Sequence, residues 1–521
     1  MPRADEYPGA ASGDACLMDL PWTNCQFLLK KVRNHLLERP NILIFMTDQQ
    51  RGDTTPPYGR AITPNLDRFS KEGVTFSQCY GPSPHCCPSR ATFFTGLYPS
   101  EHGVWNNVSV GNAISRGLNN GVRLFSEDLR DGGYRLHFSG KWHVSAEEDP
   151  GDRGWECGIL TALTPKEALK RTPYTPEWKR YLDLKYDPDP SERREGEIQR
   201  PGYGPYFHYG VRNEKTSDDK IIESAAEIIR SRSKTGEPWC QYIGPIGPHD
   251  PYFVPQKYLD MYDPADIELP ESYTDRMDDK PALYRRTRDR FDQLSDEEHR
   301  EAIRHYLAYC TYEDALFGQV LDALDESGEA ENTVVVYVSD HGDYAAEHGL
   351  WCKGLPCFKG AYHVPLIIRW PAGIERPGRN VDAFTSLADL APTFLDVAGI
   401  RVDRHFAGRS LLPFLRGQAP SEWRDAVFTQ SNGNELYGIQ RSVMTRDWKY
   451  VYNGFDYDEL YDLKNDPNEM KNLARNPEYA EVIRELAGRL WRFAYEHQDV
   501  CVNPYIMVAL APYGPAEAFR Q

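Results

Sequence analysis

The sequence SPHCCPSRATFFTGLYP, residues 83–99, contains the pattern Cys-x-Pro-Ser-Arg at the beginning of an apolar run with helical character. Pro88 suits the first turn of a helix, because amide hydrogens there have no partner within the helix. Gly96 predicts where this helix ends. We therefore expect Cys86 at a helix N-terminus, where backbone N–H groups favour an anion, and Arg90 pointing back toward it. The alternative is that the two adjacent cysteines are buried structural thiols.

Two apolar stretches lead into residues that can bind a metal ion. Residues 41–46 and 333–338 are typical of buried parallel strands, and they are followed by Asp48-Gln49 and Asp340-His341. Because parallel strands of one sheet present their carboxyl ends at the same edge, we expect both pairs to converge on one divalent cation. The alternative is that Asp340 only caps a helix.

Cationic side chains follow other predicted strands. Lys141 and His143 come after a predicted strand at 134–138, and on extended backbone two residues that are two positions apart face the same side. His249 lies in a predicted loop, and Lys353 follows further along the chain. Together with a candidate nucleophile, these cations indicate an anion-binding site.

Composition restricts the class of protein and its partners. The 521 residues carry a net charge of −18, which argues against nucleic acid or an anionic membrane as a partner. The 11 cysteines are odd in number and scattered, which favours reduced thiols and a cytoplasmic location over a disulfide framework. Residues 1–38 have the pattern of neither a signal peptide nor a membrane span. The oligomeric state stays open, a homo-oligomer included.

The chain length favours a large catalytic domain with a smaller second one. We predict an N-terminal extension at 1–38, with one amphipathic helix over 25–37, and a catalytic domain at 39–417. Short alternating runs between 426 and 452, followed by a helix at 478–496, predict a C-terminal subdomain at 418–521 that contains an antiparallel sheet. Two polar segments are expected to form long irregular loops over the site. These are residues 163–214 and 263–292.

The block at Cys86, joined to the Asp-Gln and Asp-His pairs, resembles the signature of the type I sulfatases, and the resemblance extends from Asn41 to about Pro467. It implies an alkaline-phosphatase-like α/β/α sandwich with a smaller C-terminal α+β subdomain. It also implies that Cys86 is oxidised to formylglycine, the catalytic aldehyde, by a formylglycine-generating enzyme or an anaerobic maturase. In this family, a hydroxyl of the hydrated aldehyde attacks sulfur, the alcohol leaves, and loss of the other hydroxyl's proton expels sulfate.

The resemblance also implies a role for each candidate residue. The metal ligands are Asp48, Gln49, Asp340, His341 and the aldehyde formed from Cys86. Calcium is the expected ion. Magnesium and manganese are the alternatives, because this chain has Gln49 and His341 where the better-known sulfatases have a second Asp and an Asn. Arg90 would orient the aldehyde hydrate, Lys141 would neutralise charge on the sulfuryl oxygens, and His143 would assist the second hydroxyl. His249 and Lys353 would contact the leaving group, and Asn107 would contact the sulfuryl group.

The function that the resemblance implies is a sulfuric ester hydrolase, which cleaves a sulfate monoester of a sugar or another small organic alcohol to the alcohol and inorganic sulfate. The alternative is a phosphonate monoester or phosphodiester hydrolase of the same superfamily, with the same aldehyde and metal set. The Gly-Lys-Trp-His stretch at 140–143 favours sulfate, because the phosphonate enzymes tend to carry uncharged residues there. A third hypothesis is that the chain is a non-catalytic, anion-binding member of the superfamily. The intact Cys86 and Arg90 argue against it.

Overall fold

The computed structural model describes residues 39–110, 113–161, 189–200, 204–232, 236–434 and 436–520. The predicted extension at 1–38, its helix over 25–37 and the first part of the predicted loop at 163–214 lie outside the described residues. Residues 40–521 form one compact unit, and the predicted boundary at 417 stays a prediction. Among the described helices, none is long and apolar enough to cross a membrane.

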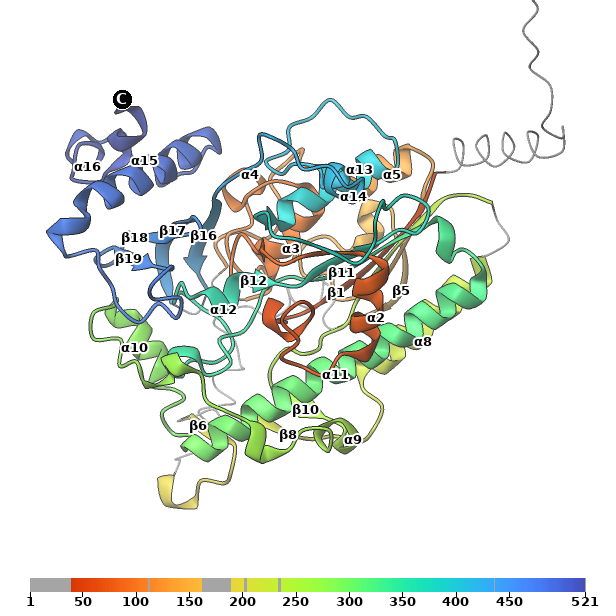
Figure 1. Cartoon of the computed structure of the whole chain (residues 1–521), viewed down its shortest axis with the longest axis horizontal. Helices are drawn as coiled ribbons and strands as arrows, with labels where there is room; N and C mark the ends of the chain where they lie inside the picture. Colours follow the sequence, from red (N-terminus) through yellow and green to blue (C-terminus); the bar gives the residue numbers. More distant parts are fainter. Residues whose placement is uncertain are drawn as a thin grey trace, which may run out of the picture. The chain divides into compact units, whose positions relative to one another are not determined.

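A mixed eight-stranded sheet forms the centre of this unit (Figure 1). Its strands, from one edge to the other, are β14 (Arg379–Val381), β2 (Val74–Phe76), β13 (Leu366–Arg369), β11 (Thr333–Ser339), β1 (Asn41–Thr47), β9 (Trp239–Gly244), β4 (Arg135–Gly140) and β5 (Glu156–Leu160). The five strands from β11 to β5 are parallel, whereas β13 is antiparallel to both of its neighbours. The expected parallel strands are therefore neighbours, with β1 and β11 at the centre.

Strand β1 divides its side chains between two hydrophobic cores. Ile42, Ile44 and Met46 belong to one core, whereas Leu43 and Phe45 belong to the other. This alternation follows from the two-residue period of a strand, and it explains why a strand covered on both faces is apolar throughout. The predicted α/β/α sandwich is confirmed.

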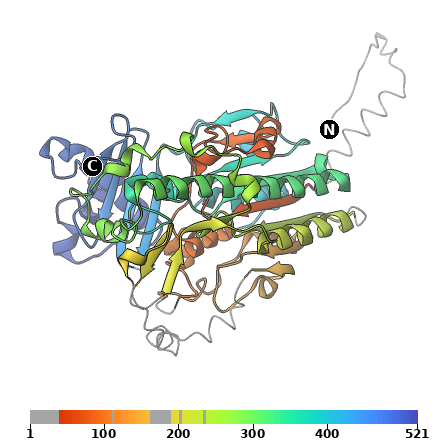
Figure 2. The ribbon, with the colours of Figure 1, turned by 90° about the horizontal axis from the view of Figure 1, so that it is seen from below.

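Helices cover both faces of the sheet. The core that contains Ile42 is completed by α3 (Cys86–Thr95), α5 (Phe125–Asp131) and α13 (Leu390–Val397). The other core is completed by α2 (Pro64–Glu72), α8 (Ser217–Arg232) and α11 (Asp296–Ser327). Helices α8 and α11 lie side by side (Figure 2). The remaining described α-helices, apart from α15, are short. They are α4 (Pro99–His102), α9 (Gln256–Leu259), α10 (Ala282–Arg288), α12 (Lys359–Tyr362), α14 (Leu412–Leu415) and α16 (Ile506–Ala509).

The C-terminal part has its own antiparallel sheet, as predicted. Its strands, in sheet order, are β16 (Val427–Gly433), β17 (Tyr437–Met444), β18 (Trp448–Asn453) and β19 (Glu459–Asp462). Helix α15 (Ala480–Glu496) packs on this sheet through a separate hydrophobic cluster that includes Val443, Tyr450 and Trp491.

Two expectations about local structure were wrong. The described end of the segment 163–214 contains β6 (Glu197–Arg200), β7 (Gly204–Phe207) and β8 (Tyr209–Val211), and β8 pairs with the distant β10 (Tyr252–Val254). Strands β6 and β7 pair with each other, and strands this short have no clear period of their own. The segment 263–292 is also not wholly irregular, because it contains α10.

The predicted strand at 364–371 is divided by Pro365 into two short strands. Strand β12 (His363–Val364) joins a small sheet with β3 (Cys79–Tyr80) and β15 (Thr385–Ser386), whereas β13 joins the main sheet. Proline has no amide hydrogen for a strand ladder, so the chain changes sheet at that position.

Helix α3 is buried on all sides, and its packing generates a stability prediction. The ring of Phe94 lies 5.0 Å from that of Trp142 and 5.2 Å from that of Tyr242, measured between centroids. Phe94→Ala should lower the free energy of unfolding by roughly 3–5 kcal/mol, because it leaves a cavity. Urea denaturation measures this loss. The control Phe519→Ala, at a side chain that is 64% exposed, should change stability by no more than about 0.5 kcal/mol, and equal losses would contradict the packing.

Candidate active site and metal centre

The register of β1 against β11 brings two aspartates together. Thr47 pairs with Ser339 at the last position of this parallel ladder, so that Asp48 and Asp340 follow at the same edge of the sheet. Both side chains are fully buried. The predicted convergence of the two strand ends is therefore present in the fold.

Arg90, which extends from α3, neutralises this pair of carboxylates. Its Nη2 donates to Asp48 Oδ2 at 3.0 Å and its Nε donates to Asp340 Oδ2 at 2.8 Å. Lys141 Nζ also contacts Asp48. Burial alone would raise the pKa of Asp48, as does a Cys86 thiolate, but the charges of Lys141 and Arg90 hold it well below its ordinary value. Asp48 is therefore ionised at neutral pH.

Asp48, Cys86, Asp340 and His341 form a group that could hold a metal ion, because one ligand atom from each lies within 4.8 Å of all the others. The Cys86 Sγ lies 3.2 Å from His341 Nε2 and 3.7 Å from Asp48 Oδ1. His341 Nδ1–H donates to the Gly342 carbonyl at 2.8 Å, which leaves a lone pair on Nε2. Carboxylate oxygens and an imidazole with a free lone pair fit a divalent cation.

Gln49 follows Asp48 but points its side chain into a second network. Its Oε1 accepts a hydrogen bond from Lys353 Nζ at 2.7 Å, and its Nε2 donates to Asp343 at 2.6 Å. An amide oxygen has two lone pairs, so the bond from Lys353 leaves one for an ion. Gln49 stays a predicted ligand.

Cys86 and Cys87 occupy opposite electrostatic environments. Burial by itself raises the pKa of the Cys86 thiol, but Lys141, Lys353 and His341 outweigh burial and lower it well below its usual value. Burial raises the pKa of Cys87, which lies in the hydrophobic core. Only Cys86 therefore has the surroundings of a reactive residue.

Lys141 and His143 both reach the surroundings of Cys86, although not for the predicted reason. Strand β4 ends at Gly140, and His143 has a φ of +56°, so the backbone is not extended across this pair. The Nε2 of His143 lies 3.1 Å from Ser109 Oγ, whereas its buried Nδ1 makes no hydrogen bond with a described residue. Burial and the charge of Lys141 lower the pKa of His143, so its imidazole is neutral.

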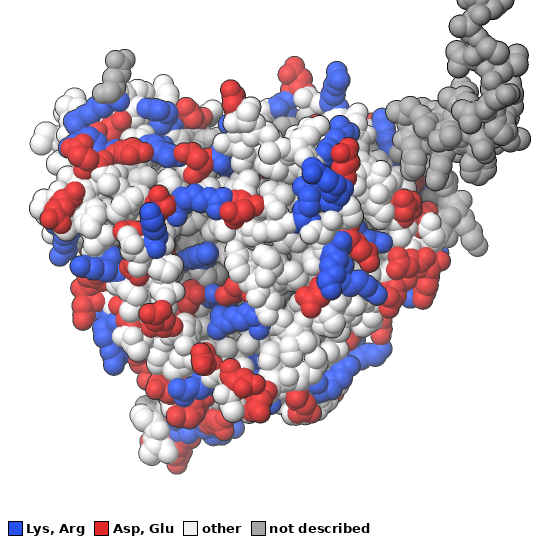
Figure 3. Space-filling model, in the orientation of Figure 1, with Lys and Arg blue, Asp and Glu red and all other residues white. Residues whose placement is uncertain are grey.

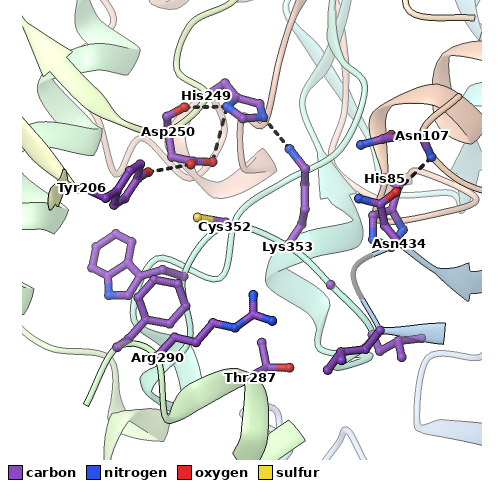
Figure 4. A pocket seen from close by; sticks show the side chains of 15 residues that line it. His85, Asn107, Tyr206, His249, Asp250, Thr287, Arg290, Cys352, Lys353 and Asn434 are labelled. Carbon is purple, nitrogen blue, oxygen red and sulfur yellow. Dashed lines mark hydrogen bonds and ion pairs between the residues drawn. The ribbon is translucent and has the colours of Figure 1, made fainter. Parts of the chain in front are cut away.

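A cavity of about 260 Å³ opens beside this group (Figure 4). On one side, His249 Nδ1–H donates to the Asp250 carbonyl at 2.7 Å and its Nε2 accepts from Lys353 Nζ at 2.7 Å. Asn107 lies across the cavity, where its Oδ1 accepts from the Cys87 amide at 3.3 Å. The predicted residues His249, Lys353 and Asn107 therefore line one pocket.

Sequence reasoning missed several residues that line this cavity. They are His85, Tyr206, Asp250, Thr287, Arg290, Phe291, Trp351 and Asn434. One signal was the positions of His85 and Asp250, beside Cys86 and His249 in sequence. The other was the pair of segments expected over the site, 163–214 and 263–292, which contain Tyr206, Thr287, Arg290 and Phe291. Tyr206 OH donates to Asp250 Oδ2 at 2.8 Å, and burial together with the charge of Lys353 lowers the pKa of His85 to about 3. Asn434 lies between β16 and β17 of the C-terminal sheet, and no local pattern predicts that it reaches the cavity.

The charges of this site contrast with those of the surface. On the face in Figure 3, Lys and Arg side chains are interspersed with Asp and Glu. In the site, Lys141 and Lys353 lie near Cys86. Burial lowers the pKa of each lysine, but the Cys86 thiolate and the Asp48 carboxylate outweigh burial and raise it. A chain with a net charge of −18 thus keeps a local group of cations beside the cavity.

An α/β/α sandwich with a group of potential metal ligands at the carboxyl ends of its central strands defines an alkaline-phosphatase-like hydrolase. Residues 40–400 match the family model described as Sulfatase, and residues 346–496 match that of the C-terminal region of N-sulphoglucosamine sulphohydrolase. The chain therefore belongs to the sulfatase family, and the predicted class of enzyme, a sulfuric ester hydrolase, is confirmed.

Two relatives in sequence agree with this assignment, and a solved structure of a related hydrolase shares the fold. The chain is 30% identical to a choline-sulfatase of Rhizobium meliloti (strain 1021), over 84% of this chain and 83% of the relative. It is 27% identical to an N-acetylglucosamine-6-O-sulfatase of Bacteroides thetaiotaomicron, over 89% of this chain and 87% of the relative. Among solved structures, a phosphonate monoester hydrolase of Agrobacterium radiobacter has a TM-score of 0.71 and 26% identity, over 89% of this chain and 97% of that chain.

The geometry of the ligand group predicts the effect of one substitution on metal binding. Asp340→Asn should weaken the binding of Ca²⁺ or Mn²⁺ by about 10- to 100-fold or more, because it removes a charged oxygen donor. Isothermal titration calorimetry measures this change, and circular dichroism checks the fold. Asp278→Asn, at a side chain that is 77% exposed, is the control. Equal affinity of both variants would show that Asp340 is not a ligand.

Proposed function

We propose that this sulfatase cleaves a small organic sulfate monoester at residue 86, after Cys86 has been converted to formylglycine. The observation that carries the proposal is the position of the Cys86 Sγ, 3.2 Å from His341 Nε2 and beside the Asp48–Arg90–Asp340 cluster. When formed, the aldehyde hydrate supplies the nucleophile. The other groups of the site bind, orient and move protons around it.

The conversion of Cys86 requires a formylglycine-generating enzyme or an anaerobic maturase, which we propose as a partner of this chain. We further propose that maturation and catalysis take place in the cytoplasm, because scattered cysteines are typical of reduced thiols. Cys87 is excluded as the target because the offsets to Pro88 and Arg90 in the pattern Cys-x-Pro-Ser-Arg fit Cys86 alone.

Maturation is tested by peptide mass spectrometry after co-expression with a maturase. We expect conversion of thiol to aldehyde at Cys86 and an unmodified thiol at Cys87. Cys86→Ala should abolish sulfatase activity, whereas Cys87→Ala should retain most of it. Modification at Cys87, or full activity of Cys86→Ala, would contradict the assignment.

We propose that Asp48, Gln49, Asp340, His341 and the modified residue 86 bind one divalent cation, with calcium as the expected ion. Three of the four side-chain donors are oxygens, which a hard cation prefers, and His341 leaves manganese as an alternative. The bound cation would stabilise negative charge on the sulfuryl oxygens. Arg90 holds both aspartates in place from the side of α3.

Each polar side chain around residue 86 has a proposed part in the reaction. Lys141 would offset negative charge on the sulfuryl group, as Asn107 would by a hydrogen bond. His143 is neutral and its buried Nδ1 has no partner among the described residues, so Nδ1 can accept a proton from residue 86. Lys353 donates to His249 Nε2 at 2.7 Å, and this pair can supply the proton that the departing alkoxide takes up.

For the alcohol, we propose a sugar or a molecule of similar size. The cavity of about 260 Å³ combines aromatic side chains, Tyr206, Phe291 and Trp351, with polar ones such as Arg290 and Asn434. Aromatic faces pack on the apolar face of a sugar ring, while polar groups hydrogen-bond its hydroxyls.

The proposal predicts a higher kcat/KM for sulfate monoesters than for phosphonate monoesters or phosphodiesters. The reason is that the Lys353–His249 pair is placed to offset the charge that builds up on the leaving oxygen, and that Lys141 lies in the stretch where phosphonate enzymes tend to carry uncharged residues. Kinetics of the matured, metal-loaded protein on sulfated sugars, aryl sulfates and phosphonate esters measure the preference. A preference for phosphonate esters across the panel would favour the alternative hydrolase and leave the aldehyde and metal assignments unchanged.

His249→Ala should distinguish acid catalysis from substrate binding. We expect a loss of kcat of about 10²- to 10⁴-fold on sulfates of poor alcohol leaving groups and a much smaller loss on activated aryl sulfates, since a phenolate leaves without a proton. Equal losses on both substrate types would show that His249 only binds the substrate.

A further inference from the structure

A second group of potential metal ligands lies apart from the residues of the active site. It consists of Glu101 in α4, His405 in the loop after α13, and His497 at the end of α15. One ligand atom from each of the three lies within 4.8 Å of the other two. Three distant parts of the chain, one of them the C-terminal helix, thus present metal-binding side chains to one point.

The spacing of these atoms fits a tetrahedral ion. The Nε2 of His405 lies 3.0 Å from Glu101 Oε1, and the Nδ1 of His497 lies 3.2 Å from the same oxygen. Zinc bonds of about 2.0–2.1 Å at tetrahedral angles place neighbouring ligand atoms about 3.3 Å apart. The side chains need little movement to close around such an ion.

Two of the three ligands are held in position by their surroundings. The Oε2 of Glu101 accepts a hydrogen bond from the Tyr98 amide at 2.9 Å, which leaves Oε1 turned toward the histidines. The ring of His497 packs against that of Phe493, with 4.2 Å between centroids. Its Nδ1 is shielded from solvent and makes no hydrogen bond of good geometry with a described residue. A metal ion would satisfy this nitrogen.

The third ligand gives access to solvent. The His405 side chain is 64% exposed, whereas those of His497 and Glu101 are 13% and 10% exposed. An ion can therefore enter from the surface, and water can fill a fourth position. Two imidazoles and one carboxylate suit zinc and other transition metals, whereas calcium and magnesium prefer more oxygen ligands than this group offers.

We propose that Glu101, His405 and His497 form a second metal site, which takes Zn²⁺ or a similar transition-metal ion. A bound ion ties α4, which directly follows the active-site helix α3 in the chain, to the end of α15. The site is thus a structural link between the catalytic core and the C-terminal helix, and the proposal does not depend on the sulfatase reaction. The alternative is a hydrogen-bonded His–Glu–His cluster without metal.

The test counts zinc ions bound to the full-length protein. Wild-type protein and His405→Ala are stripped with a chelator, dialysed against ZnCl₂ in excess CaCl₂, and analysed by inductively coupled plasma mass spectrometry. We expect the variant to hold one zinc equivalent per chain less than the wild type. Because His405 is largely exposed, its removal leaves the packing intact.

A second variant and a control complete the design. Glu101→Gln should also lose one equivalent, although its amide oxygen can still accept from the Tyr98 amide, whereas Glu422→Gln on the surface should lose none. Zinc should raise the Tm of the wild type more than that of His405→Ala, because a ligand that binds only the folded state stabilises it. Equal zinc content of the wild type and His405→Ala would overturn the proposal.

Discussion

The parallel register of β1 and β11 is the constraint on which the site depends. It places Asp48 and Asp340 at adjacent strand ends, where both are fully buried. Two buried carboxylates at close range are tolerated only when opposite charge is supplied, and loss of one partner of a buried ion pair costs about 3–5 kcal/mol. Arg90 supplies that charge from α3, which explains why this helix packs with its N-terminal turn against the strand ends.

The same packing accounts for the position of Cys86. Cys86 lies one turn before Arg90 in α3. Because Arg90 contacts both aspartates, Cys86 lies at the same point, and its Sγ contacts His341. Lys141 and Lys353 then make this point positive, although the chain as a whole is strongly acidic. At physiological ionic strength charges are screened beyond about 8 Å, so these nearby lysines matter more to an anion in the cavity than the distant surface does.

Much of this arrangement could be predicted from sequence, because it depends on strong local patterns. The apolar runs that end in Asp48 and Asp340 predicted buried strands with polar residues at one edge, and Pro88 and Gly96 predicted the limits of α3. The cavity walls could not be predicted in this way. Tyr206 and Asn434 reach the cavity because the β6–β7 pair and the C-terminal sheet lie beside the active site, and packing between such distant segments leaves no periodic signal. The turn at His143, with its positive φ, was missed for a similar reason, since it depends on contacts beyond the strand.

The proposed metal site requires Asp48, Asp340, His341 and the modified residue 86 to bind one ion at a single point. Crystals of the matured protein, grown with Mn²⁺ and measured on both sides of the manganese absorption edge, test it most directly. We expect an anomalous peak within bonding distance of both aspartates, His341 and residue 86. An ordered site without such a peak, or a peak that only one of the two aspartates contacts, would contradict it.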